Sequence, residues 1–444
     1  MALVAFLLFS CTPTSSPPLT TSSSPTPKET PEFDTEPFTI VLLPDTQYYT
    51  EEDEPTTYEA QTLWISNTEN IEFVIHLGDI TNDNANTEWK IASAAHQIFD
   101  EADIPYSMIP GNHDYPGHGK KRDTTRYNSY FGPHRFTGEP WYGGHMGEEN
   151  DNNYTYFDFK GLEFMVVGLE FAPRKDALCW ADNLIQSHPE RRVIIVTHCY
   201  LGHDGDYQDC PTKYNKDGTI RYSIVGSSGD TVWEELVRRH SNIFMVLSGH
   251  VGDSELVSHS GYAGNTVYEI LTDYQFETDI DGNSHGNGWL RTMTFIPNEN
   301  KIKVNTFTVL ENVTSFNRVS HYPSDPNDQT HTYTLTYEMN TPLDTYTYNR
   351  ITNAFNDRTV NSNSRGHQLD PTIAMASDGS FVVVWEDDRN ENDIYQIKAR
   401  GFNADGTESF SDITVNTYSD GQQLDPAIAM ASDGSFVVVW EDDR

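Results

Sequence analysis

Apolar and polar positions alternate along residues 33–341 in a pattern that predicts strands separated by helices. Short apolar runs, FTIVLL at 38–43 and EFVIHL at 72–77, are typical of buried strands. Residues 57–67 are amphipathic, and residues 86–101 are the next helix candidate. Such strand–helix units indicate a sheet with helices packed against it. Two hairpins are also predicted, from the strand candidates 154–159, 163–170, 291–297 and 301–309.

From about residue 353 the pattern changes to strands alone. The segment QLDPTIAMASDGSFVVVWEDDR at 368–389 recurs almost unchanged at 423–444, with a period of 425 − 370 = 55 residues. One period holds four strand candidates, TIAMA, SFVVVWE, IYQIKARGF and ITVN. Four short strands in a repeat of about 50 residues are typical of a β-propeller blade. Because such repeats need neighbours to bury their faces, we expect an array truncated at Arg444, and a complete two-blade sandwich is the alternative.

The first residues, MALVAFLLFSC, resemble an export signal. Their apolar run from Ala2 to Phe9 is eight residues long, whereas a membrane-spanning helix needs about 20. Cys11, preceded by LFS, resembles a bacterial lipobox, in which the cysteine carries a lipid. An ordinary signal peptide is the alternative. We therefore expect an exported bacterial protein, either a cell-surface lipoprotein that touches the membrane only through Cys11 or a secreted protein.

The Ser-, Thr- and Pro-rich composition of residues 12–32 cannot bury a core and predicts a tether between the leader and a folded domain. The domain organisation that follows is given by the ranges 1–11 (leader), 12–32 (tether), 33–341 (the domain of strands and helices), 342–352 (linker) and 353–444 (repeats).

The chain is strongly acidic, with 28 basic and 67 acidic residues and a net charge of 28 − 67 = −39. A surface of this charge repels a nucleic acid backbone, so we expect no nucleic-acid-binding surface. It also repels phosphorylated substrates unless bound metal reverses the sign locally.

Three cysteines follow the leader, namely Cys179, Cys199 and Cys210. An exported location permits a disulfide. Cys199 and Cys210 are the pair nearest in sequence and the pairing we expect, and three buried thiols are the alternative.

Five polar segments carry the candidate chemistry, and nearly all of them follow a strand candidate. Side chains from the ends of separate strands can converge on a pair of metal ions, which neutralise phosphate oxygens and turn a bridging water into hydroxide. The segments are PDTQ at 44–47, GDITN at 78–82, GNHD at 111–114, THC at 197–199 and GH at 249–250.

In this order the segments resemble the calcineurin-like metallophosphoesterase family, whose pattern is Asp-x-His, Gly-Asp-x-x-Asn/Asp, Gly-Asn-His-Asp/Glu, a His after a strand, and Gly-His-x-His. PDTQYY resembles the opening of a secreted branch of the family, and the resemblance covers about residues 36–310. It implies an α/β (α+β) fold, a double β-sheet sandwich flanked by helices, which the all-β propeller-like repeats follow. It also implies that a metal-bridging hydroxide hydrolyses phosphomonoesters or phosphodiesters.

The resemblance implies two divalent metal ions, with Mn, Fe, Zn, Mg or Ca as candidates. Asp79 would bridge both ions. Asn112, His198 and His250 would hold the second ion, and Asp45 the first.

Two catalytic residues are implied beside the metals. His113 would act as the general acid or hold the phosphate in place. Asp114 would accompany it, and Asp114 and Asn82 would orient the histidine and its loop.

Two positions depart from the family pattern, because Gln47 stands where a His is common and Gly252 stands where the last His would be. The first ion is therefore left with oxygen donors from Asp45, Gln47 and Asp79. Oxygen donors suit Mn²⁺, Mg²⁺ or Ca²⁺ better than Zn²⁺. We therefore predict one tight site and one weaker site, with Asp253 as a possible replacement ligand.

A second hypothesis comes from a different class of protein. In a surface binding or adhesion protein, the phosphoesterase domain would be degenerate, and the repeats would bind a surface polymer or a protein. Gly252 favours this reading, whereas the matching residues at the other motif positions favour catalysis. The sequence does not define the substrate beyond a phosphate ester.

Overall fold

The computed structural model describes residues in thirteen ranges, which are 36–51, 55–159, 161–214, 220–277, 286–309, 331–339, 343, 360–361, 365–376, 380–392, 394–403, 407–431 and 434–443. The predicted leader with Cys11 and the tether at 12–32 lie outside them, as does the predicted linker at 342–352 apart from Leu343. Contacts divide the chain into a larger unit that ends at Tyr348 and a smaller unit that includes Asn349–Arg444.

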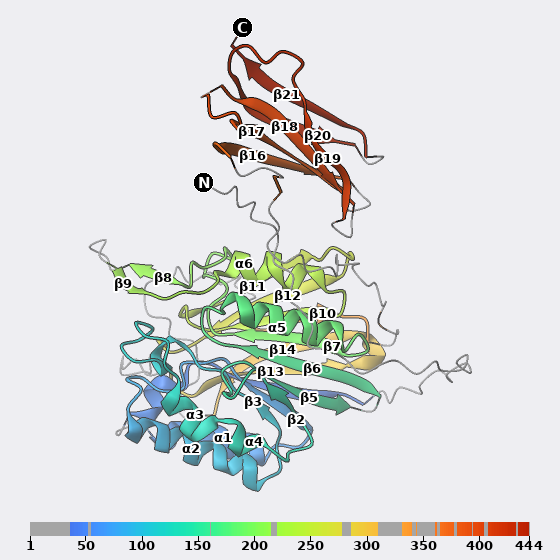
Figure 1. Cartoon of the computed structure of the whole chain (residues 1–444). Helices are drawn as coiled ribbons and strands as arrows, with labels where there is room; N and C mark the ends of the chain where they lie inside the picture. Colours follow the sequence, from blue (N-terminus) through green and yellow to red (C-terminus); the bar gives the residue numbers. More distant parts are fainter. Residues whose placement is uncertain are drawn as a thin grey trace. The chain divides into compact units, whose positions relative to one another are not determined.

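Two β-sheets form the centre of the larger unit (Figure 1). The six-stranded sheet has the order β15-β14-β13-β1-β2-β3, with bounds β1 Phe38–Leu43, β2 Ile71–His76, β3 Tyr106–Ser107, β13 Trp289–Ile296, β14 Lys301–Thr308 and β15 Tyr333–Thr336. The seven-stranded sheet has the order β11-β12-β10-β7-β6-β5-β4, with bounds β4 Tyr142–His145, β5 Asn153–Phe159, β6 Leu162–Leu169, β7 Arg192–Thr197, β10 Ile243–Ser248, β11 Asp253–Ser260 and β12 Thr266–Asp273.

Parallel pairing at the centre of each sheet places several strand ends at a common edge. In the first sheet β1 is parallel to β2, and β2 to β3. In the second sheet β6, β7, β10 and β12 are parallel neighbours. Loops that follow these strands therefore emerge together, which is where open α/β sheets place ligands.

Side chains of β1 alternate between two apolar cores, because successive residues of a strand point to opposite faces. Ile40 and Leu42 lie in the core between the two sheets. Val41 and Leu43 lie in a second core, which the strand shares with helices. Burial on both faces explains why this strand is an uninterrupted apolar run.

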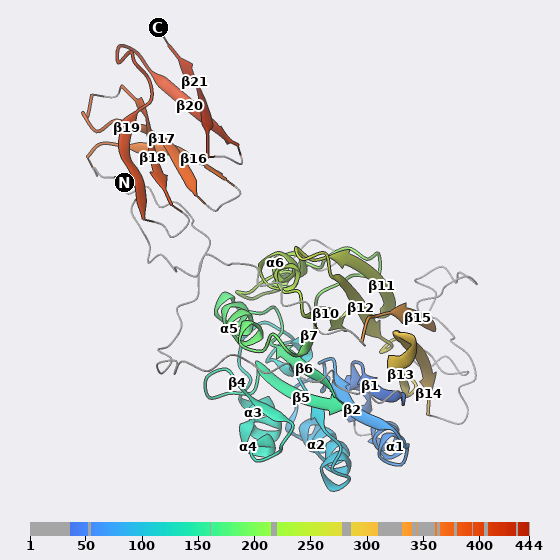
Figure 2. The same ribbon diagram turned by 90° about the vertical axis from the view of Figure 1, so that its right-hand side faces the viewer.

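Helices cover the outer face of each sheet (Figure 2). Residues of α1 (Pro55–Ser66), α2 (Asn86–Glu101), α3 (Thr125–Phe131) and α4 (Pro133–Phe136) pack beside the six-stranded sheet. Residues of α5 (Lys175–Gln186) and α6 (Gly229–Glu235) pack beside the other sheet. This arrangement confirms the predicted double sheet flanked by helices. Within the described residues, no helix has the length and apolar character needed to cross a membrane.

The described part of the smaller unit contains strands from both sequence repeats. The first repeat forms an antiparallel sheet in the order β16-β17-β18-β19, and the second contributes the hairpin β20-β21. The bounds are β16 Gln368–Met375, β17 Phe381–Asp387, β18 Gln396–Phe402, β19 Glu408–Thr414, β20 Gln423–Met430 and β21 Phe436–Asp442. The four strands of the first repeat and the hairpin of the second confirm the all-β prediction, and the propeller itself stays a prediction.

The second repeat packs its hairpin onto a face of the first. Val382 and Val384 of β17 are 2% and 0% exposed and share a core with residues of β20 and β21. Val437 and Val439 of β21 occupy the same positions in an identical SFVVVWEDDR sequence, yet they are 66% and 60% exposed. A neighbouring repeat, rather than local sequence, decides whether these valines are buried.

Replacing the same valine in the two repeats should therefore have different effects on stability. We expect Val384→Asp to cost at least about 3 kcal/mol, because it buries an uncompensated carboxylate. The matched control Val439→Asp should change stability by about 0.5 kcal/mol or less, because this position faces solvent. Hydrogen exchange of the β17 amides in the full chain measures the difference, and equal protection in the two variants would contradict the packing.

Candidate metal centre

All five predicted motifs lie in loops that follow parallel strands. Asp45 comes two residues after β1 and precedes the short helix η1 (Thr46–Thr50). Asp79 follows β2, His198 follows β7, and His250 follows β10. Asp45, Asp79 and His250 adopt positive φ angles of 36°, 47° and 74°, a conformation that costs energy in non-glycine residues and often marks functional sites.

Four of the predicted ligands meet in space. Ligand atoms of Asp79, His198 and His250 lie within 4.8 Å of one another. The His198 Nε2 atom is 3.1 Å from Asp79 Oδ2 and 3.9 Å from Asp45 Oδ1. The His250 backbone N–H donates to Asp45 Oδ1 at 3.3 Å. The structure therefore brings together residues that are up to 205 positions apart in the sequence.

The His198 ring is held so that its Nε2 atom faces these carboxylates. Its Nδ1 atom lies 2.8 Å from the Leu77 carbonyl oxygen, which can only accept, so the proton is on Nδ1. In the neutral ring the Nε2 lone pair then points toward two acidic side chains. A cation between them, a proton or a metal ion, is needed to make this arrangement favourable.

Three buried oxygen atoms of predicted ligands have no hydrogen-bond donor. They are Asp45 Oδ2, Gln47 Oε1 and Asn112 Oδ1, and the three residues are 2%, 1% and 3% exposed. A buried polar atom without a partner costs about 1–3 kcal/mol. Oxygen acceptors together with imidazole nitrogen are the donor set of divalent metal ions. The residues present therefore fit the metal pair that the motifs predict.

Buried carboxylates dominate the electrostatics of the site. Burial, then Asp273 and Asp79, raise the pKa of Asp45 well above its usual range. Burial also acts to raise the pKa of Asp79, but His198, His113 and His250 outweigh it and the pKa is lowered. Several acidic groups held away from water are unfavourable without compensating positive charge.

Two motif glycines allow the loops to approach the carboxylates closely. A Cβ atom on Gly111 would lie 2.2 Å from Asp79 Oδ1, and one on Gly249 would lie 2.2 Å from Asp45 Oδ2. Both contacts are too short for any other residue. The glycines of GNHD and GH are therefore required by close packing against the predicted ligands.

His113 is positioned by backbone contacts and by a second imidazole. Its backbone N–H donates to Asp79 Oδ1 at 2.8 Å, and its ring Nδ1 lies 2.7 Å from the Asn82 carbonyl oxygen. The ring stacks on His118 with centroids 4.3 Å apart. Asn82 contacts the histidine through its carbonyl, whereas its side chain donates to Glu51 Oε1 at 2.8 Å. Its role in orienting the histidine stays a prediction.

Asp114 binds two loops together through hydrogen bonds to both carboxylate oxygens. Its Oδ2 atom accepts from the N–H groups of Ile80 at 3.0 Å and Gly111 at 2.8 Å. Its Oδ1 atom accepts from the N–H and the hydroxyl of Thr81 at 2.9 and 2.8 Å. With four donors on one buried carboxylate, Asp114 is a positioning residue for the loops that carry Asp79 and His113, and its predicted catalytic role is not tested.

Position 252 lies against the Phe276 ring. A Cβ atom on Gly252 would lie 2.3 Å from this ring, which is 48% exposed, so a side chain here would require the ring to move. Asp253, the predicted replacement, starts β11 and pairs with Asp273 at the end of β12. Asp253 is partly buried, whereas Asp273 is 1% exposed and acts on Asp45. Sequence reasoning missed Asp273, the last residue of β12, because no motif surrounds it.

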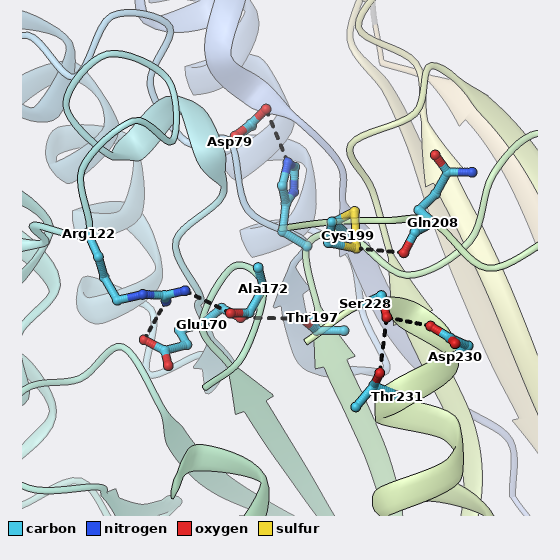
Figure 3. The surroundings of a disulfide bond; sticks show 12 residues. Asp79, Arg122, Glu170, Ala172, Thr197, Cys199, Gln208, Ser228, Asp230 and Thr231 are labelled. Atoms are coloured by element: carbon cyan, nitrogen blue, oxygen red, sulfur yellow. Dashed lines mark hydrogen bonds and ion pairs between the residues drawn. A yellow bond between two sulfur atoms is a disulfide. The ribbon is translucent and has the colours of Figure 1, made fainter. Parts of the chain in front are cut away.

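The predicted disulfide between Cys199 and Cys210 is confirmed (Figure 3). The two Cα atoms are 5.8 Å apart, and Cys199 follows His198 directly. The Gln208 N–H also donates to the Tyr200 carbonyl oxygen at 2.9 Å. The bond therefore restrains the backbone on one side of a predicted metal ligand.

Metal affinity should increase as the pH is raised from acid toward neutral. The raised pKa of Asp45 means that a proton stays on this carboxyl at higher pH than usual, and that proton competes with a metal ion. Titrations with Mn²⁺ at about pH 5.5 and about pH 7.5 measure the change. In Asp45→Asn we expect weaker binding with a smaller pH dependence, and wild-type protein with the same affinity at both pH values would contradict this view.

Comparison with known proteins agrees with the geometry. Residues 38–254 match the calcineurin-like phosphoesterase family, a range that contains Asp45, Asp79, His198 and His250. The chain is 30% identical over 281 residues to the uncharacterized protein YvnB of Bacillus subtilis (strain 168), covering 61% of this chain and 20% of YvnB. It is 22% identical over 135 residues to the probable glycerophosphodiester phosphodiesterase GpdQ of Arcobacter nitrofigilis, covering 29% of this chain and 41% of GpdQ. The chain thus spans less than half the length of these curated relatives.

Solved structures similar to this chain include a dimetal phosphatase from Danio rerio, with 14% identity and a TM-score of 0.40 over 68% of this chain and 99% of that one. The purple acid phosphatase PPD1 from yellow lupin (Lupinus luteus) seeds has 14% identity and a TM-score of 0.41 over 69% of this chain and 55% of that one. In its motifs and in the match over residues 38–254, the part of the chain that carries the predicted metal ligands is similar to the calcineurin-like phosphoesterase family.

Proposed function

We propose that the larger unit hydrolyses phosphate esters with two divalent cations. The observation that carries this proposal is the cluster of Asp79, His198 and His250 in loops that follow parallel strands, together with buried oxygen acceptors without donors in the same set of motifs. The residues that would hold the cations are Asp45, Gln47, Asp79, Asn112, His198 and His250.

A pair of divalent cations, when bound, neutralises phosphate oxygens and lowers the pKa of a water molecule for attack on phosphorus. The cations would also attract the substrate, because a chain with a net charge of −39 otherwise repels an anionic ester. The protein's own contribution is to hold the carboxylates and imidazoles in place before substrate arrives.

His113 is the residue we assign to proton transfer. Its Nδ1 is engaged by the Asn82 carbonyl oxygen, so Nε2 is the nitrogen left for the substrate. A proton on Nε2 can pass to the ester oxygen that leaves, which is general acid catalysis. Stacking on His118, whose Nε2 lies 3.0 Å from Asp83 Oδ1, restricts the plane of the ring.

Both phosphomonoesters and phosphodiesters are proposed substrates. The name of GpdQ, a probable glycerophosphodiester phosphodiesterase, supports including a diester. The divalent metal is not fixed by the residues present, and Mn²⁺ is the first cation to test because it accepts both oxygen and imidazole ligands.

Hydrolysis of p-nitrophenyl phosphate and bis-p-nitrophenyl phosphate by the full chain tests this function. We expect turnover only after Mn²⁺ is added to metal-free protein. Asp79→Asn should lose activity because it removes a carboxylate that would hold the cations. His113→Ala should lower kcat by at most about 10²–10⁴-fold, the range of general acid catalysis, because p-nitrophenolate is a good leaving group. His134→Ala, an exposed histidine in α4, is the matched control and should keep activity.

Folded protein without turnover in any metal would contradict the proposal. It would favour the alternative, a surface binding protein with a degenerate domain whose repeats bind a polymer or a protein.

We also propose that the protein is exported and that Cys11 carries a lipid, because residues 1–11 resemble a lipoprotein leader and residues 12–32 a tether. Labelling a bacterial host with an alkyne fatty acid should label the wild-type protein and not Cys11→Ser. Unlabelled wild-type protein in the culture medium would instead indicate an ordinary signal peptide.

A further inference from the structure

We propose that Asp273 is a ligand of the first metal ion and takes the place of the imidazole that the family pattern has at position 252. The proposal rests on the two-cation site described above. Asp273 lies outside residues 38–254, which match the family.

The segment after β12 lies beside position 252, where the Phe276 ring would lie 2.3 Å from a Cβ atom on Gly252. As a glycine, this position has no side chain to supply a ligand. The same short segment carries Asp273 and Gln275, which are 1% and 6% exposed. One substitution in the family pattern therefore coincides with a buried acid supplied by the neighbouring strand.

Strand pairing brings Asp273 to the correct edge of the sheet. β12 runs parallel to β10, with Leu271 beside Ser248. Asp273 is two residues beyond Leu271, and His250 is two residues beyond Ser248, so the two lie at the same edge. His250 in turn contacts Asp45 through its backbone N–H. Consistent with this placement, Asp273 is the charged group that contributes most to raising the pKa of Asp45.

A chain of amide hydrogen bonds links Asp273 to Gln47. The Gln275 backbone N–H donates to Asp273 Oδ1 at 2.8 Å, and the Gln275 side-chain Nε2 donates to Asp273 Oδ2 at 2.7 Å. The Gln275 Oε1 atom in turn accepts from Gln47 Nε2. Asp273 therefore fixes the side chain of Gln275, and Gln275 fixes that of Gln47.

The donor and acceptor of each of these hydrogen bonds follow from the chemistry of Asp273. A carboxylate accepts hydrogen bonds and cannot donate them, so Gln275 must present its NH₂ group to Asp273. Its oxygen then faces Gln47, which must present its own NH₂ group. The Gln47 Oε1 atom is left buried and without a donor, available to a cation. Gln275 is therefore a positioning residue for two ligands.

The resulting first site contains oxygen donors only, from Asp45, Gln47, Asp79 and Asp273. The second site has imidazole nitrogen from His198 and His250. Oxygen-only sites select hard cations such as Mn²⁺, Mg²⁺ and Ca²⁺, whereas imidazole favours Zn²⁺ and other transition metals. The two positions should therefore differ in which metal they prefer, and Asp273 sets this difference.

Metal counting on the full chain tests the proposal without measuring activity. The number of bound ions is counted after Mn²⁺ loading and removal of excess metal, and the affinity of each site is measured by Mn²⁺ titration. We expect two ions per wild-type protein. In Asp273→Asn the affinity of the weaker site should fall at least tenfold, with the tighter site unchanged. Asp182→Asn is the matched control, because Asp182 is also buried, at 2% exposure, and pairs with His240 in another part of the unit. It should keep both ions.

A structural role for Asp273 would be seen in the metal-free protein. A ligand carboxylate crowded against other carboxylates should be unfavourable without metal, so metal-free Asp273→Asn should melt at the same temperature as the wild type or higher. A lower melting temperature together with two tightly bound ions would overturn the proposal.

A second variant, Asp273→His, tests whether residue 273 binds the first ion, and it replaces Asp273→Asn if that variant does not fold. An imidazole at this place should shift the first site's preference from Mn²⁺ toward Zn²⁺ by at least tenfold, and an unchanged preference would overturn the proposal. Loss of the weaker site in Asp253→Asn but not in Asp273→Asn would also overturn it in favour of Asp253. Wild-type protein that binds no metal would instead refute the two-cation site itself.

Discussion

Carboxylates that approach one another away from water are the constraint on which this site depends. Asp45, Asp79 and Asp273 are all buried and act on one another electrostatically. A folded protein can keep such a group only if positive charge is supplied, by protons or by metal ions. The neighbouring imidazoles and the oxygens of Gln47 and Asn112 that have no donor suit a metal ion better than a proton. The same charge that is unfavourable without a cation gives the site affinity for cations.

The rest of the larger unit holds this charge in a fixed geometry. The two sheets supply parallel strand ends at common edges, and cores on both faces of each sheet keep those ends rigid. Asp114 uses four hydrogen bonds to join the loops that carry Asp79 and His113. The Cys199–Cys210 bond restrains the chain after His198. Preorganisation of this kind lowers the cost of arranging charged groups around a transition state.

Local patterns in the sequence were enough to predict many features of this structure. The strand at 38–43 and the helix at 86–101 have the predicted bounds, because the spacing of apolar residues that defines each element is present in its own sequence. The motifs named four residues that the structure brings together, Asp45, Asp79, His198 and His250, since strand ends at one edge of a sheet must lie close together. The pairing of Cys199 with Cys210 also followed from their short separation.

Features that depend on distant neighbours could not be predicted in this way. Asp273 has no motif around it, and its importance appears only when β12 is placed beside β10. The space taken by Phe276 next to Gly252 is likewise a tertiary contact. Identical valines in the two repeats differ in burial because only one pair is covered by another repeat. In each case the residue is explained by what packs against it, which the local sequence does not contain.

Anomalous diffraction from crystals of the full chain soaked in Mn²⁺ would test the central claim most directly. The account predicts two separate manganese peaks that share the Asp79 carboxylate, one with imidazole ligands from His198 and His250 and one surrounded by oxygen atoms alone. A single peak, or no peak at these strand ends in well-ordered crystals, would contradict it.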